Sequence, residues 1–369
     1  MIQRRSFLAK AGGALATTTL ATALDAPSVI AQPKFQWRMS TAWPPALKLM
    51  HGSAVRLAKT VEELSGGRLR IEVFAGDQIV PAFGAFEAAS KGTIEAFMGA
   101  PSYWADNEPA IEWFQTVPFG MNPDGMEAWY HQGDGLKLWQ ETYAPFNLVP
   151  RQGPAFAPQL AGWFRKKINS AADYKGLRMR IGAGLGNKVV TKAGGTAVLI
   201  PAAGIFAAFE RGVIDAAEWV GPHDDMELGL HNSARYYYYY YPGWHEPGTV
   251  SEFTFNRKAY DALPVDLRQL LDHAVEAEQV YFSADYHAKN SIALARLKSE
   301  FKGKVEILQL PTAALRELKK LSGEVIREQS EKTPQAKKVN ASFAKFQALV
   351  GPWDHVAEGA YHQLVAGAS

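Results

Sequence analysis

A carboxylate stands directly beside a large aromatic residue at Glu218 and Trp219, just before a Gly-Pro break. The residues from Val213 onward predict a short strand that ends at this pair. Ligands bind at the carboxyl ends of strands in open α/β sheets, so the pair is suited to a pocket wall. Read alone, it is equally compatible with a surface acid beside a core tryptophan.

Other predicted strand ends carry further candidates. Arg180 ends a strand over 177–181, and an arginine in that position can hold a carboxylate through two parallel hydrogen bonds. The competing interpretation is a solvated arginine on an edge strand. This interpretation is favoured when Arg180 is considered by itself. Trp43 and Tyr103 follow earlier strands. Each is by itself more typical of the core, but several aromatics at strand ends together favour a pocket.

Six consecutive tyrosines, Tyr236 to Tyr241, predict a strand covered on both faces, because an amphipathic helix does not carry six aromatics in a row. The loop P-G-W-H-E-P-G follows at 242–248. It places Glu246 in a second acid-aromatic segment bracketed by proline and glycine.

Motifs for cofactor or covalent chemistry are missing from the sequence. The glycines at 182–186 do not complete G-x-G-x-x-G, because Asn187 occupies the last position. They predict a close backbone approach or a helix start instead. The adjacent H-D-D at 223–225 diverges on a helix, which favours a helix N-terminus over a metal site. The absence of cysteine excludes disulfides and thiolate chemistry.

The N-terminus predicts export. Arg4-Arg5 precedes a short apolar run, and small residues suit cleavage after Ala31, as in a twin-arginine signal peptide. A membrane anchor is the weaker alternative, because the run is short and rich in alanine and threonine. Without residues 1–31, Lys+Arg falls from 39 to 36 and Asp+Glu from 37 to 36. The mature chain is near neutral, which gives no support for nucleic acid as a partner.

Strands and helices alternate through most of the chain and predict an α/β fold with parallel sheets. From Pro264 onward the chain is nearly all helix. The expected strands are 35–40, 68–74, 92–98, 160–164, 177–181, 196–200, 236–241, 249–256 and 305–308. The expected helices are 46–64, 83–90, 184–193, 202–210, 264–301, 312–331 and 335–348.

Six segments together carry a family resemblance. S-G-G-R-L (65–69) and K-G-L-R-M-R-I (175–181) are widely shared in that family, and V-P-F-G-M (117–121) and Gln159 with G-W-F-R (162–165) also match. I-D-A-A-E-W-V-G-P (214–222) and Y-P-G-W-H-E-P-G (241–248) are specific to one subgroup. The chain resembles the solute-binding proteins of tripartite ATP-independent periplasmic (TRAP) transporters. It is most similar to the subgroup that binds 2-oxo acids such as pyruvate.

The resemblance implies an α/β, two-lobed periplasmic binding protein fold with a central cleft, a long helix spanning both lobes and a helical C-terminus. We expect the signal peptide at 1–31, lobe 1 at 32–152 completed by about 249–308, and lobe 2 at 153–248. C-terminal helices at 309–369 are expected as a possible dimerisation element, because members of the subgroup can exchange a C-terminal helix.

The resemblance also implies a site. Arg180 is expected to grip the substrate carboxylate, and Gln159 to reach the substrate or a metal ion. Glu218, the main-chain carbonyl of Trp219, and Glu246 are expected to hold that ion. Trp43 and Tyr103 complete the expected substrate contacts.

An oxygen-only ligand set suits a hard cation. The resemblance favours sodium. However, Arg180, two glutamates and a monocarboxylate sum to a charge of −2, which calcium would neutralise, so calcium stays open. Gly182-Ala183-Gly184 stands where the family commonly has proline after the arginine, which leaves the pocket shape open. The loop at 43–47 and the segment 155–158 have few polar groups, which favours a small or moderately apolar monocarboxylate.

We therefore predict a periplasmic solute-binding protein, not an enzyme, that delivers a small 2-oxo monocarboxylate to TRAP membrane subunits. A periplasmic lyase or isomerase acting on the same acids is the alternative. Twin-arginine export often carries cofactor enzymes, but no nucleophile or cofactor motif supports that alternative. The sequence does not separate transport from ligand sensing.

Overall fold

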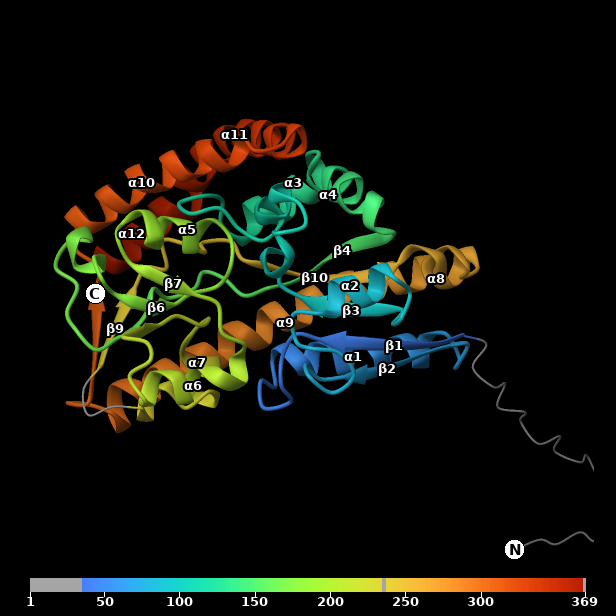
Figure 1. The fold of residues 1–369 in the computed structure, drawn as a ribbon, viewed down its shortest axis with the longest axis horizontal. Coiled ribbons are helices and arrows are strands. Elements are labelled where there is room, and N and C mark those ends of the chain that lie inside the picture. The colour runs from blue at the N-terminus through green and yellow to red at the C-terminus, as the bar shows by residue number, and fades with distance from the viewer. Residues whose placement is uncertain (1–34, 234–236, 368–369) are drawn as a thin grey trace, which may run out of the picture. The chain divides into compact units, whose positions relative to one another are not determined.

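One five-stranded sheet has the order β2-β1-β3-β10-β4 in the computed structural model (Figure 1). β1 is parallel to β2 and β3, whereas β10 is antiparallel to β3 and β4. The expected parallel arrangement holds for β1, β2 and β3, whereas β10 runs antiparallel to both of its neighbours. The strands are β1 Phe35–Thr41, β2 Leu69–Phe74, β3 Ala96–Gly99, β4 Leu148–Ala155 and β10 Val250–Asn256.

A second, six-stranded sheet has the order β11-β9-β5-β8-β6-β7. β6 is parallel to β7 and β8, β5 is antiparallel to β8 and β9, and β11 is parallel to β9. β11 was expected within the 249–308 segment that completes lobe 1, but it pairs in this sheet. The strands are β5 Gly162–Phe164, β6 Arg178–Arg180, β7 Thr196–Val198, β8 Ala216–Ala217, β9 Tyr237–Tyr241 and β11 Val305–Gln309.

Two local predictions about the second sheet need correction. Val213 and Ile214 precede β8 instead of starting it, because their backbone amides donate to the Ala208 carbonyl of α6 (Ala202–Glu210) and not to a neighbouring strand. The tyrosine strand is covered at most of its described positions, but Tyr241 is 42% exposed at its end.

The structure describes residues 35–233 and 237–367, so the predicted signal peptide lies outside the described residues. All of the described residues belong to one compact unit. Across the described residues, no helix combines the length and the apolar character needed to cross a bilayer.

Helices cover both sheets. They are α1 Met50–Leu64, α2 Ala85–Ser90, α3 Pro123–Gln132, α4 Gly135–Tyr143, α5 Leu185–Lys192, α6 Ala202–Glu210, α7 Pro222–Glu227, α8 Arg257–Asp261, α9 Val265–Glu300, α10 Thr312–Ser330, α11 Pro334–Asp354 and α12 Ala360–Gly367. Short 3-10 turns are η1 Pro101–Trp104, η2 Pro109–Phe114, η3 Ala144–Phe146, η4 Ala171–Tyr174 and η5 Leu230–Asn232, and η6 His355–Gly359 is a π-helical turn.

The 36-residue helix α9 connects the regions of the two sheets. It packs against α1 and β4 on the first-sheet side and against α7 and β11 on the second-sheet side (Figure 1). The expected long helix spanning both lobes is confirmed.

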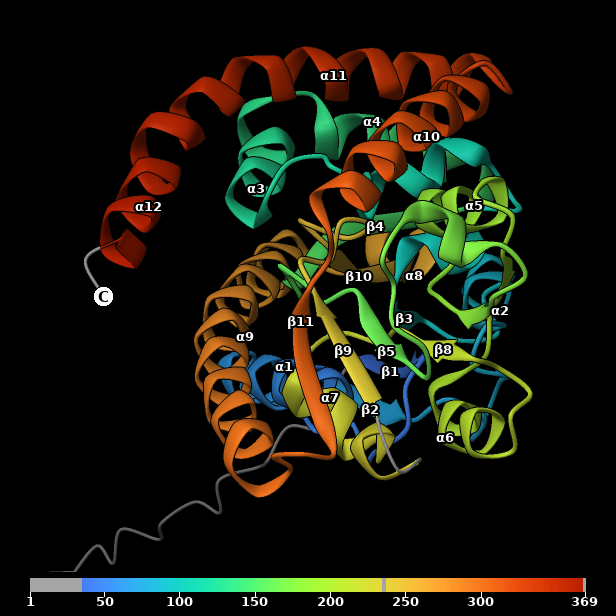
Figure 2. The same cartoon turned by 90° about the vertical axis from the view of Figure 1, so that its left-hand side faces the viewer.

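The C-terminal helices continue from the second sheet along the outside of the first. α11 packs on α3, α4 and η2, and the chain bends through η6 into α12 (Figure 2). α11, η6 and α12 carry large exposed apolar side chains, among them Leu349, Trp353, Val356, Tyr361 and Leu364.

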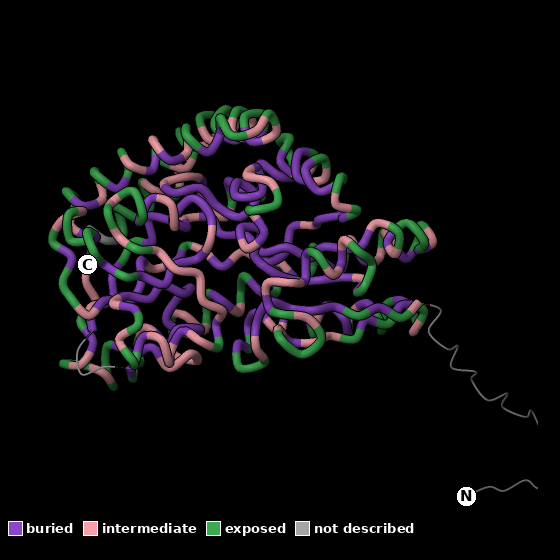
Figure 3. The backbone as a smooth tube through the Cα atoms, in the orientation of Figure 1, coloured by how far each residue is buried: buried purple, intermediate pink, exposed green. Residues whose placement is uncertain are grey.

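Buried residues follow the strands of both sheets, and exposed residues gather on the outer helices (Figure 3). A continuous apolar core joins the two regions. Several charged side chains lie inside it, among them Arg180, Glu218 and Glu246, each at most 5% exposed. Buried charges are costly unless they are paired or bind an ion, which draws attention to this group.

Candidate functional site

A small cavity, with about 30 Å³ of space for water-sized molecules, lies where strand ends of the two sheets approach each other. All seven residues predicted as site residues line it, namely Trp43, Tyr103, Gln159, Arg180, Glu218, Trp219 and Glu246. They come from loops that follow or precede strands of both sheets, so the fold brings together residues that are far apart in sequence.

Arg180 is the last residue of β6 and is 1% exposed. Its Nη1 donates to the Glu218 carbonyl at 2.6 Å and to Glu218 Oε2 at 3.0 Å. Its Nε donates to the Ile200 carbonyl, and its guanidinium lies 4.7 Å from the centre of the Trp219 ring. Nη2 has no hydrogen-bond partner among the described residues, so it can bind a ligand oxygen.

The interpretation of solvated arginines on an edge strand is wrong for Arg180, which is buried, whereas Arg178 is solvated although β6 lies between β8 and β7 and is not an edge strand. Arg178 is exposed at the outer end of the same strand and pairs with Asp215 at 2.7 Å. The two arginines share a strand face, but only the inner one reaches the cavity.

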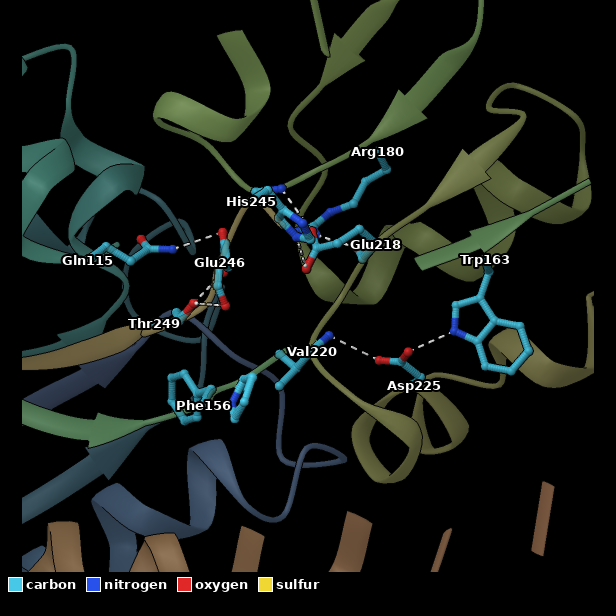
Figure 4. A network of polar contacts seen from close by, with 12 residues as sticks. Gln115, Phe156, Trp163, Arg180, Glu218, Val220, Asp225, His245, Glu246 and Thr249 are labelled. Atoms are coloured by element: carbon cyan, nitrogen blue, oxygen red, sulfur yellow. Dashed lines mark hydrogen bonds and ion pairs between the residues drawn. The ribbon is translucent and has the colours of Figure 1, made fainter. Parts of the chain in front are cut away.

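Glu218 is held in place by donors on one side of its carboxylate. Oε2 accepts from Arg180 and from the Gly182 amide at 3.1 Å, and Oε1 lies 3.7 Å from His245 Nε2 (Figure 4). A Cβ on Gly182 would lie 3.0 Å from Glu246 Oε1. A side chain at Gly182 would therefore crowd the Glu246 carboxylate, and the predicted helix start at these glycines is confirmed because α5 begins directly after Gly184.

Glu246 receives only neutral hydrogen-bond donors. Gln115 Nε2 donates to Oε1 at 3.2 Å, and Thr249 Oγ1 donates to Oε2 at 2.9 Å. Burial, followed by the charge of Glu218, raises the pKa of Glu246 to about 7. A bound cation would offset both effects, because an opposite charge nearby favours the ionised carboxylate.

His245 lies beside both carboxylates and is 1% exposed. Burial lowers the pKa of this imidazole, but the neighbouring Glu218 and Glu246 outweigh burial, and the pKa is raised. His245, Gln115 and Thr249 were not predicted from the sequence as site residues. His245 and Thr249 flank Glu246 closely enough to be inferred from it, whereas no pattern marks Gln115.

Gln159 and Trp219 line the cavity, and each has an oxygen atom that receives no hydrogen bond from the described chain. Gln159 Oε1 is buried without a partner. The carbonyls of Glu218 and Val220 accept from Arg180 and Leu160 respectively, whereas no described residue donates to the Trp219 carbonyl between them. Free oxygens in a buried site are suited to an ion or ligand.

These atoms form an oxygen donor set of two carboxylates, one amide and one main-chain carbonyl. Such a set fits a hard cation such as sodium or calcium. Groups of three or more histidine or carboxylate side chains that could hold a metal are not found in the described chain. The set here has two carboxylates, so neutral oxygens would have to complete it.

The opposite wall of the cavity is apolar and aromatic. Trp43 packs edge-on against Phe156 at 5.6 Å, and Met50 lies beside them on the wall. Tyr103 also lines the cavity, and burial raises the pKa of its hydroxyl, which stays protonated and able to donate.

Comparison with known proteins identifies the family. The model for bacterial extracellular solute-binding proteins, family 7, matches residues 39–333. The chain belongs to this family. The predicted two-lobed TRAP solute-binding fold with a helical C-terminus is confirmed by the solved relatives described below.

Relatives of this solute-binding protein cover nearly its whole length. A monocarboxylate 2-oxoacid-binding periplasmic protein of Nostoc sp. is 34% identical and covers 99% of each chain. A TRAP solute-binding protein of Bordetella bronchiseptica, solved as a dimer with calcium and picolinate, is 35% identical over 91% of this chain and 98% of its own, with a TM-score of 0.87. One of Pseudoalteromonas atlantica, solved with sodium and pyruvate, is 34% identical over 89% and 98%, with a TM-score of 0.85.

The acidic residues of α7 in this solute-binding protein differ from the expectation of a simple helix N-terminus. The helix does begin at Pro222, but Asp224 and Asp225 are buried, at 0% and 1% exposure. Asp225 accepts hydrogen bonds from Trp163 and from the Val220 amide (Figure 4). The pair is therefore part of the packed interior next to the cavity.

Proposed function

We propose that this solute-binding protein captures a small 2-oxo monocarboxylate such as pyruvate, together with a sodium or calcium ion, and delivers it to TRAP membrane subunits. One observation carries the proposal. The free Nη2 of Arg180 and the oxygen atoms of Glu218, Glu246, Gln159 and Trp219 belong to residues that line a single small cavity. The named ligands of the relatives, 2-oxo acids and picolinate with a cation, support it.

The proposed roles follow from the chemistry of each group. Arg180 binds the substrate carboxylate through its free guanidinium nitrogen. Glu218, Glu246 and the Trp219 carbonyl hold the cation, and Gln159 Oε1 completes its surroundings or binds the substrate. When bound, the cation supplies positive charge that can attract both the carboxylate and the keto oxygen of one substrate molecule.

Charge balance keeps both cations within the proposal. With Arg180, two ionised glutamates and a monocarboxylate, a sodium ion leaves the site at −1, whereas a calcium ion makes it neutral. Burying net charge is costly, which favours calcium on this count. The relatives include a sodium and a calcium complex, so the titration below includes both ions.

The walls of the cavity support a monocarboxylate. Arg180 is the single cationic side chain among the described residues that line it. A dicarboxylate would bring a second negative charge toward Trp43, Met50 and Phe156, where it has no partner. We infer that the chain of the substrate packs on this apolar wall and stays short.

Calorimetric titration tests the proposal directly. Purified mature protein is titrated with pyruvate in buffers that contain calcium, sodium or neither, and then with lactate and succinate. Pyruvate is expected to bind most tightly with one of the cations, lactate more weakly because it lacks the keto group, and succinate not to bind. Absence of binding to every monocarboxylate would contradict the proposal.

We also propose that the protein binds its substrate without converting it to a product, as expected for a transport protein and not for an enzyme. Pyruvate incubated with the protein and cation is expected to give an unchanged NMR spectrum. A new product signal would instead identify a lyase or isomerase.

The proposed location and assembly can be tested separately. We infer that export removes residues 1–31 and that residues 309–369 mediate a homodimer, in which the apolar face of α11 and α12 meets a second copy. The exposed Trp353 and Leu364 support this. N-terminal sequencing of the exported protein tests the cleavage site. Light scattering of the full chain and of a chain ending at residue 348 tests the dimer.

A further inference from the structure

A third buried carboxylate lies behind the cavity without lining it. Asp225, on α7, is 1% exposed and accepts three hydrogen bonds. Oδ2 accepts from Trp163 Nε1 at 2.7 Å and from the Tyr239 hydroxyl at 2.8 Å, and Oδ1 accepts from the Val220 amide at 3.1 Å. The proposed function gives Asp225 no role.

The two side-chain donors hold the carboxylate rigidly. Trp163 on β5 and Tyr239 on β9 are paired across the second sheet, and their rings stack at 4.1 Å. Both residues are 0% exposed. Because strands of the sheet fix Oδ2, the remaining oxygen of Asp225 has a defined direction.

The donor on the other side is part of the peptide that joins Trp219 to Val220. The cis peptide bonds among the described residues are at Pro158 and Pro242, so this peptide is trans. In a trans peptide the N–H and the C=O point in opposite directions. A hydrogen bond that turns the Val220 N–H toward Asp225 therefore turns the Trp219 carbonyl away from it.

The opposite direction is the cavity. Trp219 and Val220 line the cavity, whereas Asp225 does not. Figure 4 shows Asp225 on one side of Val220 and the cavity residue Phe156 on the other. The Trp219 carbonyl is also the one that receives no hydrogen bond from the described chain, although both flanking carbonyls do.

We propose that Asp225 is a positioning residue for the cation, which it reaches through the Trp219–Val220 peptide. This inference rests on the proposed function. Asp225 fixes the plane of the peptide so that the Trp219 carbonyl faces the ion. Its carboxylate also polarises the peptide, which places more negative charge on the carbonyl oxygen. Outer partners of metal ligands commonly act in this way.

The neighbouring acid provides a matched control. Asp224 is 0% exposed on the same helix, and neither of its carboxylate oxygens has a hydrogen-bond partner in the described chain. Asp225→Asn and Asp224→Asn therefore make the same chemical change in adjacent buried positions. Only the first alters the group that accepts the Val220 N–H.

Calorimetry of calcium and sodium binding at saturating pyruvate is the first measurement. Asp225→Asn is expected to weaken cation binding by roughly 10- to 100-fold, the range found for outer partners of metal ligands. Asp224→Asn is expected to bind like the unsubstituted protein. Equal cation affinity in Asp225→Asn and the unsubstituted protein would overturn the proposal. Thermal unfolding shows whether each variant is folded.

A second measurement does not need a variant. Trp219-Val220 is the one Trp-Val pair in the sequence, so protein labelled with carbonyl-13C tryptophan and 15N valine gives one correlation for this peptide. Calcium with pyruvate is expected to shift the Trp219 carbonyl resonance, and Asp225→Asn to shift the Val220 amide proton. An unmoved carbonyl resonance in protein that calorimetry shows to be loaded would overturn the proposal, even if Asp225→Asn does not fold.

The experiments distinguish an error in the proposed function from an error in the proposed role of Asp225. If the unsubstituted protein binds neither cation nor pyruvate, the proposed function is wrong and the role of Asp225 falls with it. If it binds both and the Asp225 tests fail, the proposed function stands and the positioning role alone is wrong.

Discussion

The two sheets contribute opposite chemistry to one cavity. Loops at the ends of first-sheet strands supply Trp43, Tyr103 and Phe156, which are apolar or neutral. Loops at the ends of second-sheet strands supply Arg180 and Glu218, together with the Trp219 carbonyl, and Glu246 follows β9 of that sheet. The comparison indicates a division of labour in which the second sheet sets charge recognition and the first sets the shape of the substrate.

The two sheets also differ in the surroundings of their buried carboxylic acids. Glu252 on β10 of the first sheet is 0% exposed, and burial raises its pKa to about 8, although Thr254 and Tyr143 donate hydrogen bonds to it. It lacks a cationic partner and stays mostly protonated near neutral pH. Glu218 on the second-sheet side has a guanidinium at 3.0 Å. Of these two buried carboxylates, only Glu218 has an oppositely charged partner among the described residues, and it is the one that lines the cavity.

Removal of the arginine should have the largest effect. Arg180→Ala leaves Glu218 buried without its partner and removes the proposed carboxylate ligand. We expect pyruvate affinity to fall more than about 100-fold and the free energy of unfolding to fall by about 3–5 kcal/mol. Calorimetry and urea unfolding measure the two effects. Arg178→Ala, an exposed change on the same strand, is the control, and pyruvate binding by Arg180→Ala as tight as in that control would break the comparison.

The buried acid of the first sheet should act on stability alone. Between about pH 4.5 and 8, Glu252 keeps its proton in the folded protein but is ionised in the unfolded chain. The free energy of unfolding therefore falls as pH rises through that window. Glu252→Gln removes this loss. The difference in the free energy of unfolding between the variant and the original protein should grow by about 1.4 kcal/mol per pH unit within this window. It should stay constant above pH 8. A pH-independent difference in urea unfolding would contradict the raised pKa.

Neutralising the second-sheet acid should instead act on the ion. Glu246→Gln keeps the size of the side chain and can keep neighbours such as Thr249, but it removes one proposed cation ligand. We expect cation affinity at pH 8 to fall by at least roughly 10- to 100-fold, which is the loss found when an outer partner of a metal ligand is removed. Glu252→Gln serves as the control with unchanged cation affinity. Equal cation affinity in Glu246→Gln and Glu252→Gln would contradict the prediction that Glu246 is a cation ligand.

A change in the apolar wall should alter selectivity more than affinity. Phe156→Leu leaves extra room beside Trp43, and a longer substrate can fill it. The affinity for 2-oxobutyrate relative to pyruvate should rise by about fourfold, because one buried methylene contributes about 0.8 kcal/mol. Phe282, whose ring lies 4.9 Å from that of Phe156 without lining the cavity, gives the control Phe282→Leu. An equal shift in both variants would assign the effect to general packing.

Much of the secondary structure could be predicted from the sequence. The helix over 202–210 matches α6, and the long helix over 264–301 differs from α9 by one residue at each end. These segments have strong periodicity and clear proline or glycine boundaries, which act locally. The direction of β10 and the sheet of β11 could not be predicted, because pairing depends on contacts between segments far apart in the chain.

The sequence by itself determined which chemical groups were available and where each would stand relative to a strand end. Arg180, Glu218 and Glu246 were identifiable in this way, with help from the family resemblance. Only the tertiary structure decided that they share one cavity, that Arg178 stays outside it, and that Gln115 reaches Glu246 from the other sheet. The physical reason is that residue type and local pattern set side-chain chemistry and strand phase. Burial and charge pairing, in contrast, arise when distant strands pack.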